Sequence, residues 1–270
     1  MSKTPGYILG QSADAARRLA IQDATFAEAS ERLLDDLALP PGARLVELGC
    51  GPGAFSARVL RRIPQGVLVG VDSSDGLLAQ SRSSLAGRRF EAVLADASEL
   101  GPWLDGADAV VGRAVLHHLP MAEFFLGRLR ARLRPGTLLG FIEPDFRSPL
   151  ARIAYLEATG RPELAPLRIW ATAINQLYAA RRISPAVGAT LAAALEAAGC
   201  RRVRSAWSEC RSDALMVANM VQFYAEVQGP LAELGVLAAE ENARQRTLLQ
   251  ALPAESLPPA WGMFRVAAEA

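Results

Sequence analysis

The chain has 270 residues, of which 51% are hydrophobic and 21% charged, and its formal net charge at pH 7 is +1. This composition is typical of a globular protein with one large domain or two small ones. A net charge so near zero gives no support for a nucleic-acid or anionic-membrane partner. The sequence contains neither the apolar core of a signal peptide nor the roughly 18 apolar residues of a membrane span, so we expect a cytoplasmic protein.

Cysteines and arginines carry little functional signal in this chain. Cys50, Cys200 and Cys210 are odd in number and widely spaced, which matches no metal-ligand pattern and argues against a disulfide framework. We therefore expect no metal site. Five arginine pairs, Arg17-Arg18 among them, are scattered along the chain and indicate solvated helix ends rather than one basic tract.

The first predicted element is a helix over residues 12–38, which ends at a Leu-Pro-Pro-Gly breaker over residues 39–42. Strand and helix patterns then alternate as far as residue 145. The expected strands are residues 44–48, 67–71, 90–94, 109–112 and 138–142, and the expected helices are residues 54–63, 75–85 and 120–133. This alternation predicts βαβ units, and hence a parallel sheet covered by helices on both faces.

The alternation breaks after residue 145. Residues 148–182 predict a helical insertion, residues 185–198 an Ala-rich helix, and residues 202–207 a strand. Residues 213–250 again predict helix, and residues 261–267 alternate like a strand. We assign residues 1–41 to a helical N-terminal lid, residues 42–147 and 183–270 to the core, and residues 148–182 to a helical substrate cover.

A glycine-rich turn, VELGCGPGAF over residues 46–55, joins the first strand of the sheet to the next helix. Glycine permits positive φ and close approach of a ligand, and the helix start offers free N–H groups. The turn also fits the dinucleotide fingerprint G-x-G-x-x-A, and packing alone is another alternative. However, Glu47 precedes the first glycine, and Asp72 and Asp96 follow the next two strands. Three carboxylates favour a ligand with amines and hydroxyls over a pyrophosphate.

Five segments in chain order carry a resemblance to a known family. They are LVELGCGPG, VGVDSSDGLL, VLADASEL, DAVVGRAVLHHLP and LRPGTLLGFIE, within residues 44–143. These segments resemble the successive motifs of class I S-adenosylmethionine-dependent methyltransferases, and the N-terminal YILGQS…RLAIQ is similar to the lid of small-molecule methyltransferases. The resemblance implies an α/β, Rossmann-like doubly wound sheet of seven strands with the last strand antiparallel. It implies S-adenosyl-L-methionine as cofactor and methyl transfer to O, N or C of a small-molecule acceptor by in-line displacement.

The resemblance also implies roles for individual residues. Glu47 would lie near the methionine ammonium, Asp72 would accept hydrogen bonds from the ribose hydroxyls, and Asp96 would accept one from the adenine amine. Arg113 would face the cofactor's carboxylate or hold its own turn. Helix capping is the alternative for Asp72 and Asp96. The other expected cofactor contacts are Tyr7, Gln22, Gly49, Cys50, Gly51, Ser73, Leu77, Ala97 and His118.

Acceptor chemistry is expected beyond the fourth and fifth strands. A sulfonium methyl is already activated, so the protein mainly aligns the reactants, and a base is needed only if the acceptor must lose a proton. His117 is the candidate base, with bracing of the loop as the alternative. Glu143 is expected to contact the substrate or to cap its turn. Trp170, Asn175 and Tyr178 in the insertion are expected to line the acceptor pocket, with core packing as the alternative.

Other functions stay open at this point. One is an NAD-dependent oxidoreductase, and another is a catalytically silent adenosyl-binding protein of the same fold. A protein or RNA methyltransferase is a third, against which the near-neutral charge and the lack of an N/D-P-P-Y-type motif after the fourth strand argue. The oligomeric state is open too, with a homodimer as one option.

Overall fold

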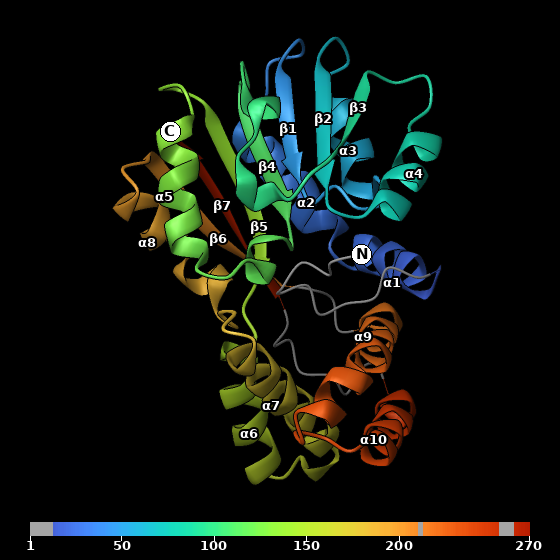
Figure 1. The fold of residues 1–270 in the computed structure, drawn as a ribbon. Coiled ribbons are helices and arrows are strands. Elements are labelled where there is room, and N and C mark those ends of the chain that lie inside the picture. The colour runs from blue at the N-terminus through green and yellow to red at the C-terminus, as the bar shows by residue number, and fades with distance from the viewer. Residues whose placement is uncertain (1–12, 210–212, 254–261) are drawn as a thin grey trace.

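The computed structural model describes residues 13–209, 213–253 and 262–270 (Figure 1). In these residues seven strands form one sheet in the order β3-β2-β1-β4-β5-β7-β6. The strands are β1 (Arg44–Leu48), β2 (Val67–Asp72), β3 (Phe90–Leu94), β4 (Ala109–Arg113), β5 (Leu138–Pro144), β6 (Arg201–Glu209) and β7 (Gly262–Glu269). Strands β1 to β5 pair in parallel, whereas β7 is antiparallel to β5 and β6. The predicted fold class is therefore confirmed.

Helices cover both faces of the sheet because neighbouring apolar residues on each strand point to opposite sides. On β1, Leu45 joins a core with α2 (Ala27–Leu37) and α3 (Ala54–Arg62), whereas Val46 joins a core with α5 (Ala122–Arg132) and α8 (Val187–Ala197). Helix α4 (Asp75–Ser84) contacts β2 and β3. The short 3-10 helices η1 (Ala97–Glu99), η2 (Pro102–Leu104) and η3 (Leu116–His118) lie after β3 and β4. Within the described residues, no helix combines the length and apolar character needed to cross a membrane.

The helix predicted over residues 12–38 is two helices, α1 (Ala13–Thr25) and α2. They meet at Phe26, whose backbone leaves helical geometry at φ −105° and ψ 16° and whose ring is buried. Helix α2 contacts β5 and β7, whereas α1 contacts α9 (Ala214–Glu233). The break therefore lets one half of the segment pack on the sheet while the other half faces the helices below it (Figure 1).

A group of helices lies beyond the carboxyl ends of the parallel strands, and we call it the helical cap. It consists of α6 (Ser148–Ala158), α7 (Ala165–Ala180), α9 and α10 (Ala239–Ala251), with η4 (Pro162–Leu164) between the first two (Figure 1). Residues 183–270 are expected in the core, but α9 and α10 within this range pack beside α7. We propose that the substrate cover consists of α9 and α10 together with the insertion over residues 148–182, instead of the insertion alone.

Candidate active site

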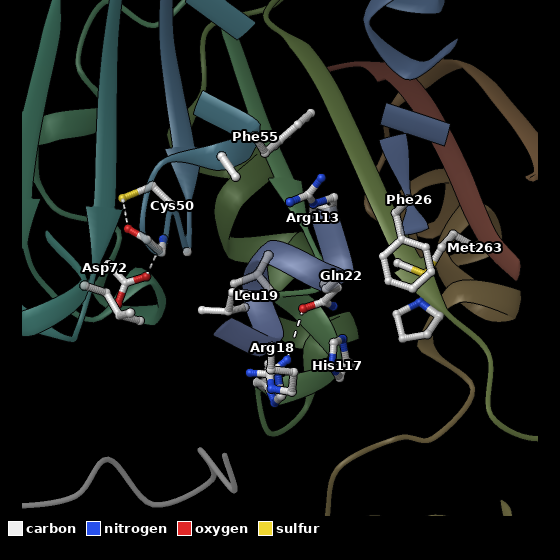
Figure 2. A pocket seen from close by; sticks show the side chains of 18 of the residues that line it. Arg18, Leu19, Gln22, Phe26, Cys50, Phe55, Asp72, Arg113, His117 and Met263 are labelled. Atoms are coloured by element: carbon white, nitrogen blue, oxygen red, sulfur yellow. Dashed lines mark hydrogen bonds between the residues drawn. The ribbon is translucent and has the colours of Figure 1, made fainter. Parts of the chain in front are cut away.

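A cavity opens where the strand order reverses between β1 and β4, below the glycine turn (Figure 2). Open parallel sheets bind ligands at such a point. Predicted residues that line the cavity are Gln22, Glu47, Gly49, Cys50, Gly51, Asp72, Ser73, Leu77, Asp96, Ala97, Arg113, His117, His118 and Trp170. Predicted residues that do not line it are Glu143, Asn175 and Tyr178. Tyr7 and Cys210 lie outside the described residues.

The glycine turn has a backbone that only glycine adopts easily. Gly49, Gly51 and Gly53 have φ values of +65°, +54° and +92°. A Cβ atom on Gly49 would lie 2.8 Å from Cγ2 of Val115, so the turn packs directly against the segment that follows β4. Cys50 within it is buried, and burial raises the pKa of its thiol. Its thiol is therefore unreactive and acts as a space-filler.

Glu47 places a buried carboxyl group in the cavity wall, with 1% of the residue exposed. The Ser56 hydroxyl donates to its Oε2 at 2.6 Å. Burial, opposed by the Ser56 bond and the charge of Arg113, raises the pKa of Glu47 to about 8. A buried carboxylate is costly unless a cation accompanies it. The methionine ammonium of the expected cofactor would supply that cation, so a carboxylate at this position fits the cofactor.

Two further carboxylates are held at strand ends by backbone N–H groups. Asp72 accepts from Gly51 N at Oδ2 and from Ser74 N at Oδ1, both at 2.9 Å, and burial raises its pKa. Asp96 caps η1, because Ser98 N and Ser98 Oγ donate to its Oδ1 at 2.8 and 2.7 Å. The capping alternative therefore holds for Asp96. It does not remove that residue from the cavity wall, where both acids lie.

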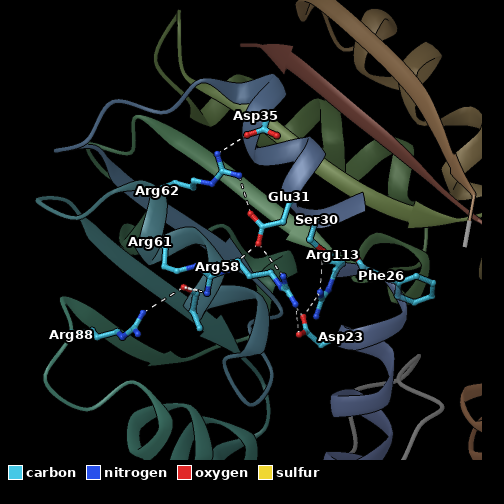
Figure 3. Close-up of polar contacts among 11 residues, drawn as sticks. Asp23, Phe26, Ser30, Glu31, Asp35, Arg58, Arg61, Arg62, Arg88 and Arg113 are labelled. Atoms are coloured by element: carbon cyan, nitrogen blue, oxygen red, sulfur yellow. Dashed lines mark hydrogen bonds and ion pairs between the residues drawn. The ribbon is translucent and has the colours of Figure 1, made fainter. Parts of the chain in front are cut away.

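Arg113 belongs to a network of ion pairs that joins α1, α2, α3 and β4 (Figure 3). Its Nη1 donates to Asp23 Oδ1 at 2.6 Å and to Ser30 Oγ at 3.1 Å, and its guanidinium lies 5.1 Å from the centre of the Phe55 ring. Arg58 donates to both oxygens of Asp23 at 3.2 and 2.8 Å. Arg113 is expected either to face the cofactor's carboxylate or to hold its own turn, and these contacts support the second role.

Glu143 lies behind the cavity and holds η3 in place. Its Oε1 accepts from the N atoms of Val115 and Leu116 at 2.9 and 2.8 Å. Its Oε2 accepts from His117 N at 3.2 Å and lies 2.8 Å from His117 Nδ1. Because the residue is fully buried and absent from the lining, the expected contact between Glu143 and the substrate is replaced by a contact with His117.

The pairing with Glu143 fixes the state of His117. When Glu143 is ionised, its carboxylate accepts at Nδ1. We therefore assign the proton of His117 to Nδ1 in that state, which leaves Nε2 unprotonated on the other edge of the ring. Burial, and then the positive charge of Arg18, lower the pKa of His117 to about 3. Burial raises the pKa of Glu143 to about 7, although the three backbone N–H groups act against it. His117 is therefore a neutral imidazole at pH 7.

An aromatic wall closes the cavity on the side of the helical cap. Trp170 on α7 meets Phe146 and Phe223 edge-on, with ring centres 6.1 and 5.8 Å apart, and all three line the cavity. Tyr178 is buried behind them, with its ring stacked 6.0 Å from that of His117. Asn175 Nδ2 donates to the carbonyl oxygen of Phe146 at 2.8 Å. Tyr178 and Asn175 therefore support the wall from behind, in place of the expected ligand contact.

Several residues that line the cavity carry no signal in the sequence that marks them as site residues. One helix face of α9 contributes Met216, Asn219, Met220 and Phe223. Their i, i+3, i+4, i+7 spacing is readable in the sequence, but it does not distinguish a face in a core from one in a cavity. The prediction that the Arg17-Arg18 pair marks a solvated helix end is wrong for Arg18, because this residue is 2% exposed and lines the cavity.

Comparison with known sequences gives matches along the chain. Residues 46–139 match the family described as a methyltransferase domain. A trans-aconitate 2-methyltransferase from Methylobacterium nodulans is 32% identical over 246 residues, which cover 91% of this chain and 90% of that protein. Another from Variovorax paradoxus is 35% identical over 139 residues, which cover 51% of this chain and 53% of that protein. The chain thus spans nearly all of one relative and about half the length of the other.

Solved structures with the same fold have little sequence in common with the chain. A cyclopropane synthase from Mycobacterium tuberculosis superposes with a TM-score of 0.59 at 15% identity, covering 90% of this chain and 84% of that one. A phosphoethanolamine N-methyltransferase from Haemonchus contortus, solved with S-adenosylhomocysteine, gives a TM-score of 0.60 at 13% identity. The superposition covers 99% of this chain and 60% of that one. At these identities the likeness concerns the fold alone.

Proposed function

Because the chain belongs to the class I S-adenosylmethionine-dependent methyltransferases, we propose that it methylates a small-molecule acceptor whose body is largely apolar. The observation that carries this proposal is the contrast between the two sides of one cavity. The sheet side presents a glycine turn and three carboxylates, and the cap side presents aromatic and methionine side chains. Membership of this family sets aside the NAD-dependent oxidoreductase.

The sheet side supports binding of the cofactor. Glu47 would hold the methionine ammonium, Asp72 the ribose hydroxyls and Asp96 the adenine amine, while Gly49 and Gly51 let the main chain come close to the ligand. S-adenosylmethionine, when bound, supplies a sulfonium-activated methyl group that needs no further activation. The work left to this chain is to bind, to align the acceptor and to exclude water.

The cap side supports an acceptor with few charges. Of the described residues that line the cavity, the arginines are Arg18 and Arg113, and Arg113 is already paired with Asp23. The relatives named above act, by name, on trans-aconitate, which carries three carboxylates. Anions of that charge need several cationic partners when water is excluded. We therefore propose an acceptor less charged than trans-aconitate, with an apolar portion against Trp170 and Phe223.

His117 is the group we propose as the base for an acceptor that must lose a proton. Its Nε2 would take the proton from an acceptor O–H or N–H as the new bond to carbon forms, and Glu143 at Nδ1 would stabilise the resulting imidazolium. With the pKa of His117 lowered to about 3, Nε2 carries no proton across the neutral range and can accept one, but the imidazole is a weak base without the support of Glu143. Removal of such a base typically costs about 10²- to 10⁴-fold in rate.

The test is calorimetric titration with S-adenosylhomocysteine and with NAD, followed by a turnover assay that detects release of S-adenosylhomocysteine. We expect the protein to bind S-adenosylhomocysteine and not NAD, and to methylate aromatic acids, phenols or arylamines faster than trans-aconitate. Faster transfer to trans-aconitate would contradict the proposed acceptor class. Tight binding of S-adenosylhomocysteine without transfer to any of these compounds would favour the catalytically silent binding protein.

A further inference from the structure

Arg18 on α1 presents a buried guanidinium to the cavity. The residue is 2% exposed, its Nε donates to Glu226 Oε1 on α9 at 2.9 Å, and its Nη1 donates to Gln22 Oε1 at 3.1 Å. Its Nη2 is buried and has no hydrogen-bond partner in residues 13–209, 213–253 and 262–270. A buried cationic N–H without an acceptor is costly, so this atom is suited to a group supplied by a ligand.

The surroundings of Arg18 select an anion. Figure 2 shows Arg18 beside His117 and away from Asp72, on one wall of the same cavity. After burial, the positive charge of Arg18 is among the causes that lower the pKa of both His117 and His118. The neighbouring imidazoles are therefore neutral, and Glu226 is the ion-pair partner of this guanidinium. Of the three guanidinium nitrogen atoms, Nε donates to Glu226 and Nη1 donates to Gln22, so Nη2 is the atom without a partner among the described residues. The arrangement suits a second carboxylate, because guanidinium N–H groups bind carboxylates better than neutral acceptors.

We propose that Arg18 Nη2 is the anion site of this cavity and receives one carboxylate group of a bound ligand. The proposal rests on the proposed function. Two ligands of that function could bring the carboxylate, namely the methionine part of the cofactor and the acceptor. Arg113, the residue expected to face the cofactor's carboxylate, already donates from Nη1 to Asp23 and Ser30. Among the described arginines that line the cavity, Arg18 is the one with a buried guanidinium nitrogen that lacks a partner.

The test compares Arg18→Gln with the wild-type protein by calorimetric titration. The first pair of probes is S-adenosylhomocysteine and 5′-methylthioadenosine, which lacks the amino-acid part. The second set, titrated with S-adenosylhomocysteine already bound, is phenylacetate, its neutral amide phenylacetamide, and trans-aconitate. Loss of a charge-assisted hydrogen bond is expected to weaken binding of the carboxylate-bearing probe by roughly ten- to a hundredfold, with its neutral counterpart unchanged.

The two sources give different results. A loss confined to S-adenosylhomocysteine assigns the site to the cofactor, whereas a loss confined to phenylacetate or trans-aconitate assigns it to the acceptor. Unchanged binding of every probe would overturn the proposal, and so would an equal loss for S-adenosylhomocysteine and 5′-methylthioadenosine, since that would indicate a structural role. Failure of the wild-type protein to bind S-adenosylhomocysteine would instead count against the proposed function.

Two more variants guard against effects on folding. Arg18→Lys keeps a cation beside Glu226 but loses the planar fork, and we expect it to retain part of the preference for the carboxylate-bearing probe. Arg32→Gln is the matched control, because Arg32 on α2 is an exposed arginine paired with Glu28. We expect it to bind all probes like the wild-type protein. Circular dichroism and thermal unfolding without ligand verify that each variant is folded.

Discussion

Glu47 and Glu143 are both fully buried carboxyl groups near strand ends, yet the protein stabilises them differently. Glu143 accepts three backbone N–H groups and lies against an imidazole nitrogen, whereas Glu47 accepts from the hydroxyl of Ser56. Hydrogen bonds to the charged form offset burial. Glu143 therefore has its partners within the chain, while Glu47 has fewer and is the carboxyl group that we propose to pair with a cation brought by a ligand.

The raised pKa of Glu47 predicts a pH-dependent stability of the ligand-free protein. Its folded-state pKa of about 8 lies above the usual 4.5, so its contribution to stability is fully present below about pH 4.5 and lost as the pH rises through 8. Glu47→Gln, which cannot ionise, should raise the melting temperature relative to the wild-type protein at pH 8.5 and have a smaller effect at pH 5. Thermal unfolding at both values measures this. Equal effects at the two values would contradict it.

Binding of the cofactor should then release a proton from Glu47. At pH 7 the group is largely protonated in the free protein, and a nearby ammonium favours its ionised form. Titration with S-adenosylhomocysteine in two buffers of different ionisation enthalpy should show proton release by the wild-type protein and none by Glu47→Gln. The variant should also bind more weakly, by roughly tenfold or more. Proton release that persists in the variant would show that another group is responsible.

Glu143 is predicted to act as a positioning residue through His117. The chain has two histidines, so ¹⁵N-histidine spectra can be assigned with a His118→Gln variant. The wild-type protein above pH 7 should show a neutral His117 protonated at Nδ1. Glu143→Gln presents an amide that can donate to Nδ1, so Nδ1–H should no longer be the single tautomer, and turnover should fall with little change in affinity for S-adenosylhomocysteine. A spectrum that is identical in the variant would contradict this role.

Among the elements, α1 depends on the network around Asp23 for its place over the cavity (Figure 3). Burial alone would raise the pKa of Asp23, but the hydrogen bonds and charges of Arg58 and Arg113 lower it below 3.8. Its contribution to stability is therefore present above about pH 3.8 and lost as the pH falls through the folded-state pKa.

Asp23→Asn should accordingly lower the melting temperature at pH 7, by an amount corresponding to about 1–3 kcal/mol, and speed the release of S-adenosylhomocysteine. The loss should shrink toward pH 3. Glu28→Gln is the matched control, because the pair between Glu28 and Arg32 is exposed on both sides and such pairs contribute about 0–1 kcal/mol. Similar losses in the two variants would refute a special role for the network.

Elements of the sheet could be predicted from the sequence because their signals are local. The run at Arg44–Leu48 and the glycines after it predict a strand and a turn, and both are found. The break at Phe26 could not be predicted, because apolar residues continue across it with helical spacing. The place of α9 could not be predicted either, since its Met216–Phe223 face would suit a core and a cavity equally well.

Within the site, the sequence predicts the residues whose location follows from the strand on which they lie. It does not predict the residues whose location depends on a contact with a distant part of the chain. The carboxylates at Glu47, Asp72 and Asp96 lie at or near the carboxyl ends of parallel strands, so their common location follows from the sheet. The partner of Glu143 could not be predicted because the contact with His117 depends on how η3 folds back on β5. Burial of Arg18 depends on Glu226, more than two hundred residues away in the chain.

For the whole molecule, ligand binding should tie the sheet to the helical cap. The cavity is lined by both, and α1 lies between them (Figures 1 and 2). At a hundred times its Kd, S-adenosylhomocysteine should stabilise the protein by about 2.7 kcal/mol, which corresponds to a rise of about 5–10 °C in Tm. Hydrogen exchange should slow in α1 and the glycine turn and remain unchanged in α6. Protection confined to α6 and α10 would place the ligand elsewhere.

The position of β7 has a consequence for how this protein is made. β7 lies between β5 and β6 in the sheet, although both precede it in the chain. A ribosome therefore delivers β6 before the strand that joins it to the rest of the sheet, whereas α9 and α10 can already pack on α1 and α7. Until β7 emerges, β5 keeps an open edge and β6 has no neighbour in the described sheet, so the nascent chain passes through a stage prone to wrong pairing. The sheet is thus completed only after β6, α9 and α10 have been synthesised.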